Sequence, residues 1–108
     1  MKVFILEDSK DRFEFLKKFH KKDIIYWSKT VPDAIKTFKK FEPFDLILLD
    51  HDLGDELDPC IGNGVEFAKF LAEQRTDSQI IIHSINVDGA KRMKDYLPDA
   101  TLIPIYMW

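Results

Sequence analysis

The stretch FDLILLDHDLG, residues 44–54, decides the fold class of this 108-residue chain. Its first part, FDLILL, is the most apolar strand signal in the sequence, and it stops abruptly at Asp50. A short segment that is apolar at nearly every position is typical of a strand buried on both faces of a parallel sheet. We therefore interpret residues 44–49 as the central strand of such a sheet, with Asp50 at its carboxyl end.

Strand and helix signals alternate along the rest of the chain. Further strands are predicted over residues 2–6, 23–27, 79–82 and 101–106. Helices are predicted over residues 10–22, from Thr30 to a stop at Pro43, from Asn63 to Arg75, and from Asn86 through Leu97. Because neighbouring parallel strands need a crossover connection, this order predicts a doubly wound α/β domain with five parallel strands. The length leaves room for one domain, which we expect to span residues 1–108.

The composition excludes several classes of protein. Hydrophobic residues make up 45% of the chain and charged residues 32%, which is typical of a globular domain and not of a disordered segment. The net charge of −3 argues against binding to duplex nucleic acid, because phosphate backbones are bound by clustered basic residues. No apolar stretch reaches the length of a membrane span, and the run before Glu7 is too short for a signal peptide.

Cysteine usage points to a reducing compartment. Cys60 is the only cysteine, so the chain can form neither an internal disulfide nor a cysteine-rich zinc site. We expect a cytoplasmic setting and interpret Cys60 as incidental, not as a nucleophile, since no base stands near it in the sequence.

Acidic side chains follow two of the predicted strands. Glu7 and Asp8 end the first strand, while Asp50 and Asp52 follow the third. The carboxyl ends of parallel strands meet at one edge of the sheet, where ligands bind in open α/β folds. Carboxylates gathered in one cleft repel each other, and a hard divalent cation relieves that repulsion. We therefore predict a Mg²⁺ or Mn²⁺ site, with Glu7, Asp8 and Asp50 as the metal ligands.

Two histidines stand among these carboxylates. His51 lies between Asp50 and Asp52, and His83 ends the fourth strand. An imidazole titrates near neutrality, so it can transfer protons in phosphoester chemistry or bind a softer metal. We predict His51, His83, Asp52 and Asp50 as the catalytic residues, with Asp52 as a ligand or a base. His20, on a predicted helix face, is interpreted as structural.

Three further residues are candidates for phosphate binding. Ser84 and the backbone amides at the helix start near Asn86 offer hydrogen-bond donors and the positive end of a helix dipole. Arg12 stands one helical turn after Asp8, where it either clamps a phosphate or points into solvent. Asp8 and Asn86 have an alternative role as helix caps, which does not exclude a role in the site.

Three motifs resemble a known family. LEDSKDR (residues 6–12), LLDHDLG (48–54) and HSINVDGAKRM (83–93) are similar to receiver domains, the phosphoacceptor modules of bacterial two-component systems, and more closely resemble the receiver-like family named for cyclic-phosphate processing. The receiver resemblance implies a flavodoxin-like fold in which Glu7, Asp8 and Asp50 hold Mg²⁺. It also implies that Asp50 accepts a phosphoryl group and that Ser84 follows that group.

The chain departs from receiver domains in two places. Receivers carry a lysine before a proline at the end of strand five, and this chain has Ile103 before Pro104. Their terminal helix is also missing, because the sequence stops at Trp108. The fifth-strand face is therefore expected to be uncovered, and a homodimer or a protein partner is expected to dock there.

The leading hypothesis is a metal-assisted phosphoesterase acting on a cyclic or terminal nucleotide phosphate, as the cyclic-phosphate resemblance implies. Two alternatives remain open. The first is a stand-alone phosphoacceptor receiver phosphorylated on Asp50. The second is a module that binds a nucleotide, another phosphate-containing small molecule or a protein without turnover.

Overall fold

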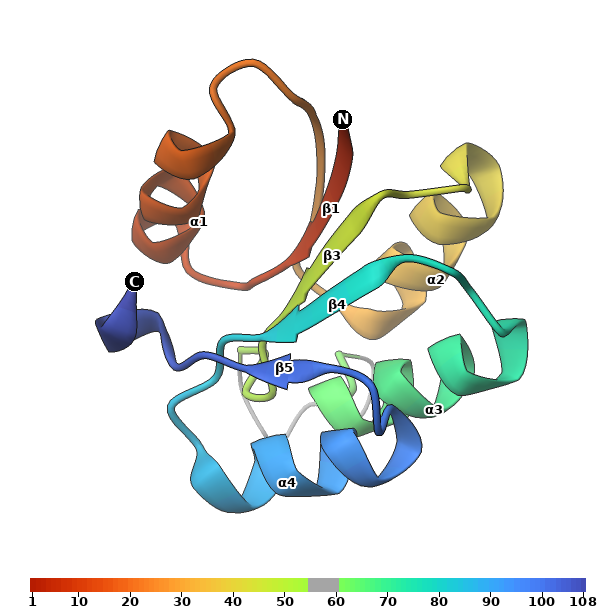
Figure 1. The fold of residues 1–108 in the computed structure, drawn as a ribbon. Coiled ribbons are helices and arrows are strands. Elements are labelled where there is room, and N and C mark those ends of the chain that lie inside the picture. Colours follow the sequence, from red (N-terminus) through yellow and green to blue (C-terminus); the bar gives the residue numbers. More distant parts are fainter. Residues whose placement is uncertain (55–60) are drawn as a thin grey trace.

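The computed structural model of the protein describes residues 1–54 and 61–108. Five parallel strands form one sheet in the spatial order β2-β1-β3-β4-β5. They are β1 (Lys2–Leu6), β2 (Ile24–Ser28), β3 (Leu46–Leu49), β4 (Gln79–Ile82) and β5 (Thr101–Leu102). Figure 1 shows α1 on one side of this sheet and α2, α3 and α4 on the other. The predicted doubly wound, flavodoxin-like architecture is thereby confirmed, with the apolar segment β3 at its centre.

Four α-helices and two short 3-10 helices connect and flank the strands. They are α1 (Lys10–Lys17), η1 (Lys18–His20), α2 (Val31–Phe41), α3 (Gly64–Gln74), α4 (Val87–Tyr96) and η2 (Ile105–Met107). None of the helices in the described part of the chain combines the length and hydropathy that a transmembrane helix needs.

Side-chain caps fix where each α-helix begins. The Oγ of Ser9 accepts a hydrogen bond from the backbone N–H of Arg12, so Ser9 and not Asp8 caps α1. Thr30, Asn63 and Asn86 accept backbone N–H bonds at the starts of α2, α3 and α4 in the same way. These bonds satisfy amides that have no partner within the helix, and each cap stabilises the fold by about 1 kcal/mol.

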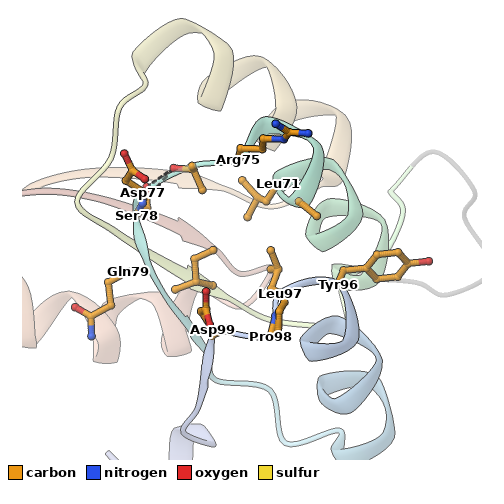
Figure 2. A pocket seen from close by; sticks show the side chains of 13 residues that line it. Leu71, Arg75, Asp77, Ser78, Gln79, Tyr96, Leu97, Pro98 and Asp99 are labelled. Atoms are coloured by element: carbon orange, nitrogen blue, oxygen red, sulfur yellow. Dashed lines mark hydrogen bonds between the residues drawn. The ribbon is translucent and has the colours of Figure 1, made fainter.

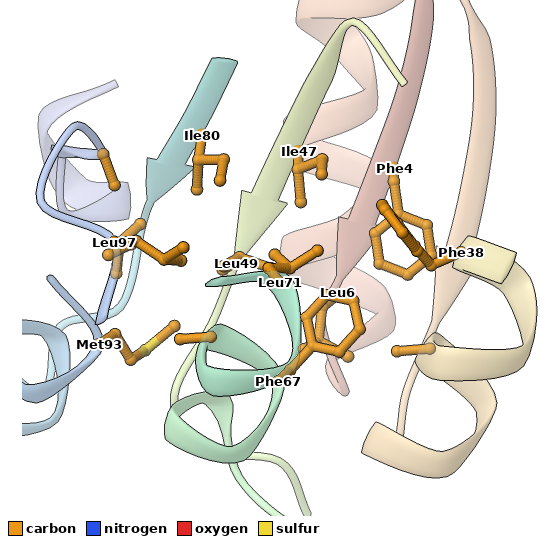
Figure 3. Close-up of a cluster of buried hydrophobic side chains, with 14 of the residues drawn as sticks. Phe4, Leu6, Phe38, Ile47, Leu49, Phe67, Leu71, Ile80, Met93 and Leu97 are labelled. Atoms are coloured by element: carbon orange, nitrogen blue, oxygen red, sulfur yellow. The ribbon is translucent and has the colours of Figure 1, made fainter. Parts of the chain in front are cut away.

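Two hydrophobic clusters hold the helices on the sheet. The larger cluster lies between the sheet and α2, α3 and α4. Figure 3 shows part of it, where Phe38 and Phe67 meet Phe4 and Leu6 of β1. The smaller cluster joins Phe13 and Leu16 of α1 to the opposite face of the sheet. Burial of each large side chain contributes about 1.5–3 kcal/mol, so both clusters fix the strands that carry the polar edge.

Three predicted elements differ from the structure in their length. The predicted helix 10–22 becomes 3-10 after Lys17 and ends at His20, whose Nδ1 lies 2.9 Å from Oδ2 of Asp23. The predicted strand 44–49 begins at Leu46. The predicted strand 101–106 is shorter still, since Pro104 has no N–H to donate. The N–H groups of residues 103 and 105 nevertheless donate to the carbonyls of residues 82 and 83, so the segment still runs beside the end of β4.

The loop after β3 is only partly described. Cys60, which the sequence marks as incidental, lies outside the described residues. On the described side, the N–H of Gly54 donates to Asp8 Oδ2 at 2.7 Å. Farther along, the N–H of Gly64 donates to the carbonyl of His51 at 2.9 Å. The two ends of the loop are thus tied to the polar edge of the sheet.

Candidate functional site

Strand register determines which polar side chains meet at the carboxyl edge. Leu6, Leu49 and Ile82 are partners across β1, β3 and β4. Backbone hydrogen bonds from the Asp50 N–H to Leu6 and from the His83 N–H to Leu49 carry this register one residue further. The next row is therefore Glu7, Asp50 and His83, and the row after it is Asp8, His51 and Ser84. Successive side chains point to opposite faces, so these two rows face opposite sides of the sheet.

The first row forms a buried acidic and histidine group on the α1 side of the sheet. One ligand atom from each of Glu7, Asp50 and His83 lies within 4.8 Å of the other two. The Nε2 of His83 lies 3.1 Å from Oε1 of Glu7, and both side chains are almost fully buried. The Nδ1 of His83 is buried without a hydrogen-bond partner among the described residues. The group thus joins two carboxylates to an imidazole in a low-dielectric setting.

Glu7 is held as a carboxylate by several donors. Arg12 donates from Nε and Nη2 to the two oxygens of Glu7, each at 2.9 Å, and the N–H of Ser9 donates to Oε2 at 3.0 Å. Burial alone raises the pKa of Glu7, but the hydrogen bonds from His83, Arg12 and Ser9 outweigh it and lower the pKa to about 2. The ion pair in turn raises the pKa of Arg12. Glu7 is therefore ionised throughout the physiological pH range.

The pKa of Asp50 is shifted in the opposite direction from that of Glu7. Burial and the negative charge of Glu7 raise its pKa to about 7, although the N–H of His51 donates to Oδ1 at 2.9 Å. Arg12 Nη2 is 3.6 Å from Oδ2, farther than from Glu7. The surrounding residues thus compensate the charge of the Asp50 carboxylate incompletely. A carboxylate in this state is suited to binding a cation.

His51 belongs to a second group on the α3 and α4 side. Its Nδ1 lies 2.7 Å from Oδ1 of Asp52, and Asn86 Nδ2 donates to the same oxygen at 3.2 Å. The imidazole packs against Gly89 of α4, where an added Cβ would come within 2.5 Å of the ring. Burial raises the pKa of Asp52, but the hydrogen bonds from His51 and Asn86 lower it overall. The structure therefore places the two histidines in separate environments, and Asp52 contacts His51 while it lines the same cavity as His83.

The predicted phosphate-binding residues take different places. The Oγ of Ser84 is buried and accepts from the N–H of Asn86 at 3.1 Å, while Asn86 caps α4 through the N–H of Gly89. The guanidinium of Arg12 contacts the acidic group, and the side chain is 43% exposed. Ser84 and Asn86 thus form the turn that starts α4, and the guanidinium of Arg12 lies with the carboxylates.

A small cavity joins the two groups. It has a volume of about 160 Å³ and is lined by Arg12, Asp50, Asp52, His83, Ile85 and Ile105. This volume is several times the ~30 Å³ that one water molecule occupies in the liquid, so the cavity has room for a phosphate-sized group. Ile85 and Ile105 give it one apolar wall.

A second cavity of about 440 Å³ lies at the other edge of the sheet. Figure 2 shows it between the end of α3 and the end of α4, with Arg75, Asp77, Tyr96 and Asp99 among its lining residues. Its lining residues come from the segments that lead into β4 and β5 and from the first residues of β4, so it faces the amino ends of the strands. Open parallel sheets bind ligands at the carboxyl ends, which favours the smaller cavity as the functional site.

The donor set fits a divalent cation. Two carboxylates and one imidazole converge, and the carboxylate of Asp50 is incompletely compensated. Oxygen ligands suit Mg²⁺, and a mixed oxygen and nitrogen set suits Mn²⁺. Glu7 and Asp50 are in place for this role, and Asp8 lies at the rim of the same group through its contact with Arg12.

The fold and this edge define a receiver-like α/β domain, and solved structures agree. The chain is similar to the non-phosphorylated HemR receiver domain from Leptospira biflexa, with 25% identity and a TM-score of 0.72 over 95% of this chain and 80% of that one. It is also similar to a CheY-like receiver domain from Methylobacillus flagellatus, with 16% identity and a TM-score of 0.73 over 96% and 85% of the two chains.

A third similar structure is the response regulator TrrA from Thermotoga maritima, solved in complex with Mg²⁺–BeF. It has 18% identity and a TM-score of 0.73 over 95% of this chain and 84% of that one. The family described as "Cyclic-phosphate processing Receiver domain" matches residues 1–99, and the chain belongs to that family. A comparison with curated proteins finds no match. The family predicted from the three motifs is thereby confirmed.

Sequence reasoning missed two contributions to the site. The indole N–H of Trp27 donates to the backbone carbonyl of Glu7 at 2.7 Å and so fixes the turn after β1. Gly89 leaves space for the His51 ring, whereas the sequence offered no reason to connect these two residues. Neither contact has a local sequence signal, because each joins residues that are far apart in the chain.

Proposed function

We propose that this domain is a metal-assisted phosphoesterase that acts on a cyclic or terminal phosphate of a nucleotide. One observation carries the proposal, namely that Glu7, Asp50 and His83 converge within 4.8 Å beside a cavity that Arg12 and Asp52 also line. Phosphoester hydrolysis needs charge compensation for the phosphate, a base for the attacking water and an acid for the leaving oxygen. This set of side chains offers a candidate for each task.

Glu7, Asp8 and Asp50 are the proposed ligands of a Mg²⁺ or Mn²⁺ ion. Such an ion, when bound, polarises the phosphate and activates a water molecule. The low pKa of Glu7 keeps one ligand ionised at all physiological pH values, and the incomplete compensation of Asp50 favours a cation near its carboxylate.

Asp52 is the proposed acceptor of the water proton. Its side chain is 45% exposed, it lines the cavity, and its Oδ1 is fixed by His51 and Asn86. His83 is the proposed proton donor to the leaving oxygen, because it lines the same cavity from the carboxyl end of the neighbouring strand β4. His51 then acts on the reaction through Asp52, as a proton relay and an orienting group.

The proposed phosphate-binding residues are Arg12, Ser84 and Asn86. Arg12 lines the cavity with a guanidinium that suits bidentate phosphate binding. Ser84 and Asn86 form the turn that opens α4, whose N-terminal end favours anions.

The test is hydrolysis of a panel of 2′,3′-cyclic, 3′,5′-cyclic and terminal nucleotide phosphates by the 108-residue protein with Mg²⁺, with Mn²⁺ and with EDTA. Cation-dependent turnover of one substrate class that disappears in Asp50→Asn supports the proposal. Turnover that persists in EDTA, or no turnover with any substrate, argues against it.

The alternative is a stand-alone phosphoacceptor receiver. Asp50 at the end of β3 and Ser84 at the end of β4 favour it, because both follow the receiver pattern. Ile103 stands in the place of the expected lysine, which removes a partner for the phosphoryl oxygens. A small phosphodonor with Mg²⁺ tests this alternative, since mass spectrometry of the intact protein detects phosphorylation that Asp50→Asn abolishes.

A partner surface near β5 is a separate proposal. Tyr106 and Met107 of η2 and Phe19 of η1 are exposed, while Trp108 lies edge-on to Phe19 with ring centroids 5.3 Å apart. Exposed apolar side chains gathered in this way mark interaction surfaces. Concentration-dependent light scattering checks for a homodimer, and a monomer at all concentrations leaves a different protein as the proposed partner.

A further inference from the structure

The guanidinium of Arg12 lies where a cation would neutralise the acidic group. Its Nη2 contacts an oxygen of each of three carboxylates, at 2.9 Å from Glu7, 3.1 Å from Asp8 and 3.6 Å from Asp50. Its Nε contacts the remaining oxygen of Glu7 at 2.9 Å. These three carboxylates are the same three that the proposed function assigns to a divalent ion.

Arg12 and such an ion would compete for the same carboxylate oxygens. Both oxygens of Glu7 already accept from Arg12, and one oxygen of Asp8 does as well. A divalent ion binds carboxylate oxygens at about 2.0–2.6 Å, so an ion on these oxygens would stand only about 4 Å from the guanidinium. Two positive groups at that distance in a partly buried site repel strongly. Each of the two therefore weakens the binding of the other to these carboxylates.

Arg12 is the group that is able to move. Its side chain is 43% exposed, whereas the side chains of Glu7 and Asp50 are 0% and 8% exposed. Glu7 and Asp50 are buried at strand ends, while Arg12 reaches them from the first turn of α1 on a long flexible side chain. Arg12 also lines the cavity that Ile85 and Ile105 border, so its guanidinium is within the reach of a ligand in that space.

We propose that Arg12 is an internal counter-ion that competes with a divalent cation for Glu7, Asp8 and Asp50, and that cation binding releases Arg12 to bind a phosphate. This inference rests on the proposed metal site but not on turnover. Arg12 lowers the affinity of the site for the cation while the cavity lacks phosphate. Once displaced, it raises the affinity for phosphate, so the two ligands strengthen each other's binding by linkage.

Isothermal titration of the metal-free protein with Mn²⁺ tests the competition. Arg12→Gln is expected to bind Mn²⁺ at least about tenfold more tightly than wild type, since it removes a positive charge next to the ion. Arg12→Lys keeps the charge but loses the fork of two donors, and its affinity is expected to lie between the two. Arg92→Gln is the matched control, because Arg92 is exposed on α4 and is not among the residues that line the cavity, while its replacement makes the same change in net charge. Its affinity for Mn²⁺ should equal that of wild type.

A second titration with inorganic phosphate tests the release of Arg12. Mg²⁺ is expected to tighten phosphate binding to wild type several-fold, and Arg12→Gln is expected to lose most of this gain. Equal or weaker Mn²⁺ binding in Arg12→Gln, or no Mn²⁺ binding in any of the variants, overturns the inference. If Arg12→Gln fails to fold without a cation, Arg12→Lys decides, because Mn²⁺ affinity no higher than wild type then overturns it. A wild-type protein that binds Mn²⁺ in this pattern but hydrolyses nothing contradicts the phosphoesterase proposal alone.

Discussion

At the scale of single residues, Asp50 is a buried carboxylate whose negative charge its neighbours compensate incompletely. Burial and the charge of Glu7 raise its pKa from 3.8 to about 7, while hydrogen bonds lower the pKa of Glu7 to about 2. The folded protein therefore holds a proton on Asp50 at pH values where the unfolded chain has released it. The stabilisation associated with this proton is complete below about pH 4 and is lost as the pH rises through about 7. Glu7 stays ionised across that window, so it does not mask the effect.

Asp50→Asn is expected to remove this pH dependence. In EDTA at pH 8 the variant should exceed wild type in its free energy of unfolding by about 1–3 kcal/mol, because a neutral amide replaces a poorly compensated buried charge. The difference should shrink toward pH 4, where Asp50 of wild type is protonated. Urea unfolding at several pH values measures it. A variant that is less stable than wild type at pH 8 would show that Arg12 already compensates Asp50 fully.

At the scale of elements, α4 packs against the His51 ring at the carboxyl edge of the sheet. Gly89 lies in the first turn of α4, and a Cβ there would approach the imidazole to 2.5 Å. Gly64 at the start of α3 makes a similar close approach, but a Cβ added there would meet the backbone carbonyl of Asp50 at 2.3 Å. Both glycines therefore set how closely a helix approaches the polar edge.

Gly89→Ala is expected to destabilise the protein by about 1–3 kcal/mol, although alanine favours a helix more than glycine does. Adding His51→Ala should recover most of that loss, because it removes the ring that the new Cβ meets. Gly64→Ala serves as the comparison, since truncating His51 leaves the backbone contact of Gly64 in place. A thermodynamic cycle over the four Gly89 and His51 variants measures the coupling, and additive effects would contradict the contact.

The elements show which parts of the site the sequence could predict. The helix starts predicted at Thr30, Asn63 and Asn86 are confirmed, because the cap that marks each start is a local interaction over two or three residues. The row Glu7, Asp50 and His83 follows from register once the strand ends are known. The separation of His51 from His83 also follows from strand alternation, because successive side chains of a strand point to opposite faces of the sheet. The prediction that all polar residues at the strand ends meet in one cleft did not take this alternation into account. The position of Arg12 had no such signal, because it depends on the rotamer of one long side chain.

At the scale of the whole molecule, one sheet organises both the core and the site. The register of three central strands sets the polar rows, and hydrophobic clusters on both faces hold those strands in place. Trp108 closes the smaller cluster, and its indole N–H donates to the carbonyl of Ile103 at 2.9 Å. The sequence predicted the order of the elements, whereas the length of β5 was overestimated because Pro104 interrupts an otherwise strand-like run.

We expect residues 1–108 to unfold as one domain. Tryptophan fluorescence, which reports on Trp27 and Trp108, and far-ultraviolet circular dichroism should give the same urea midpoint. Trp108→Ala should lower the free energy of unfolding by about 1–3 kcal/mol without splitting the transition, because it opens one side of the smaller cluster. Two separate transitions in wild type would contradict a single cooperative unit.

The most direct test of the central claim compares His83→Ala with His20→Ala in cation-dependent hydrolysis of a nucleotide cyclic phosphate. His20 is also buried, but its Nδ1 lies 2.9 Å from Oδ2 of Asp23 and it is not part of the acidic group. His20→Ala therefore controls for the loss of a buried imidazole. With both variants confirmed as folded, we predict that His83→Ala lowers the rate by about 10²–10⁴-fold while His20→Ala retains the wild-type rate. Equal rates in the three proteins, or wild type without turnover, would contradict the assignment of this edge as a phosphoesterase site.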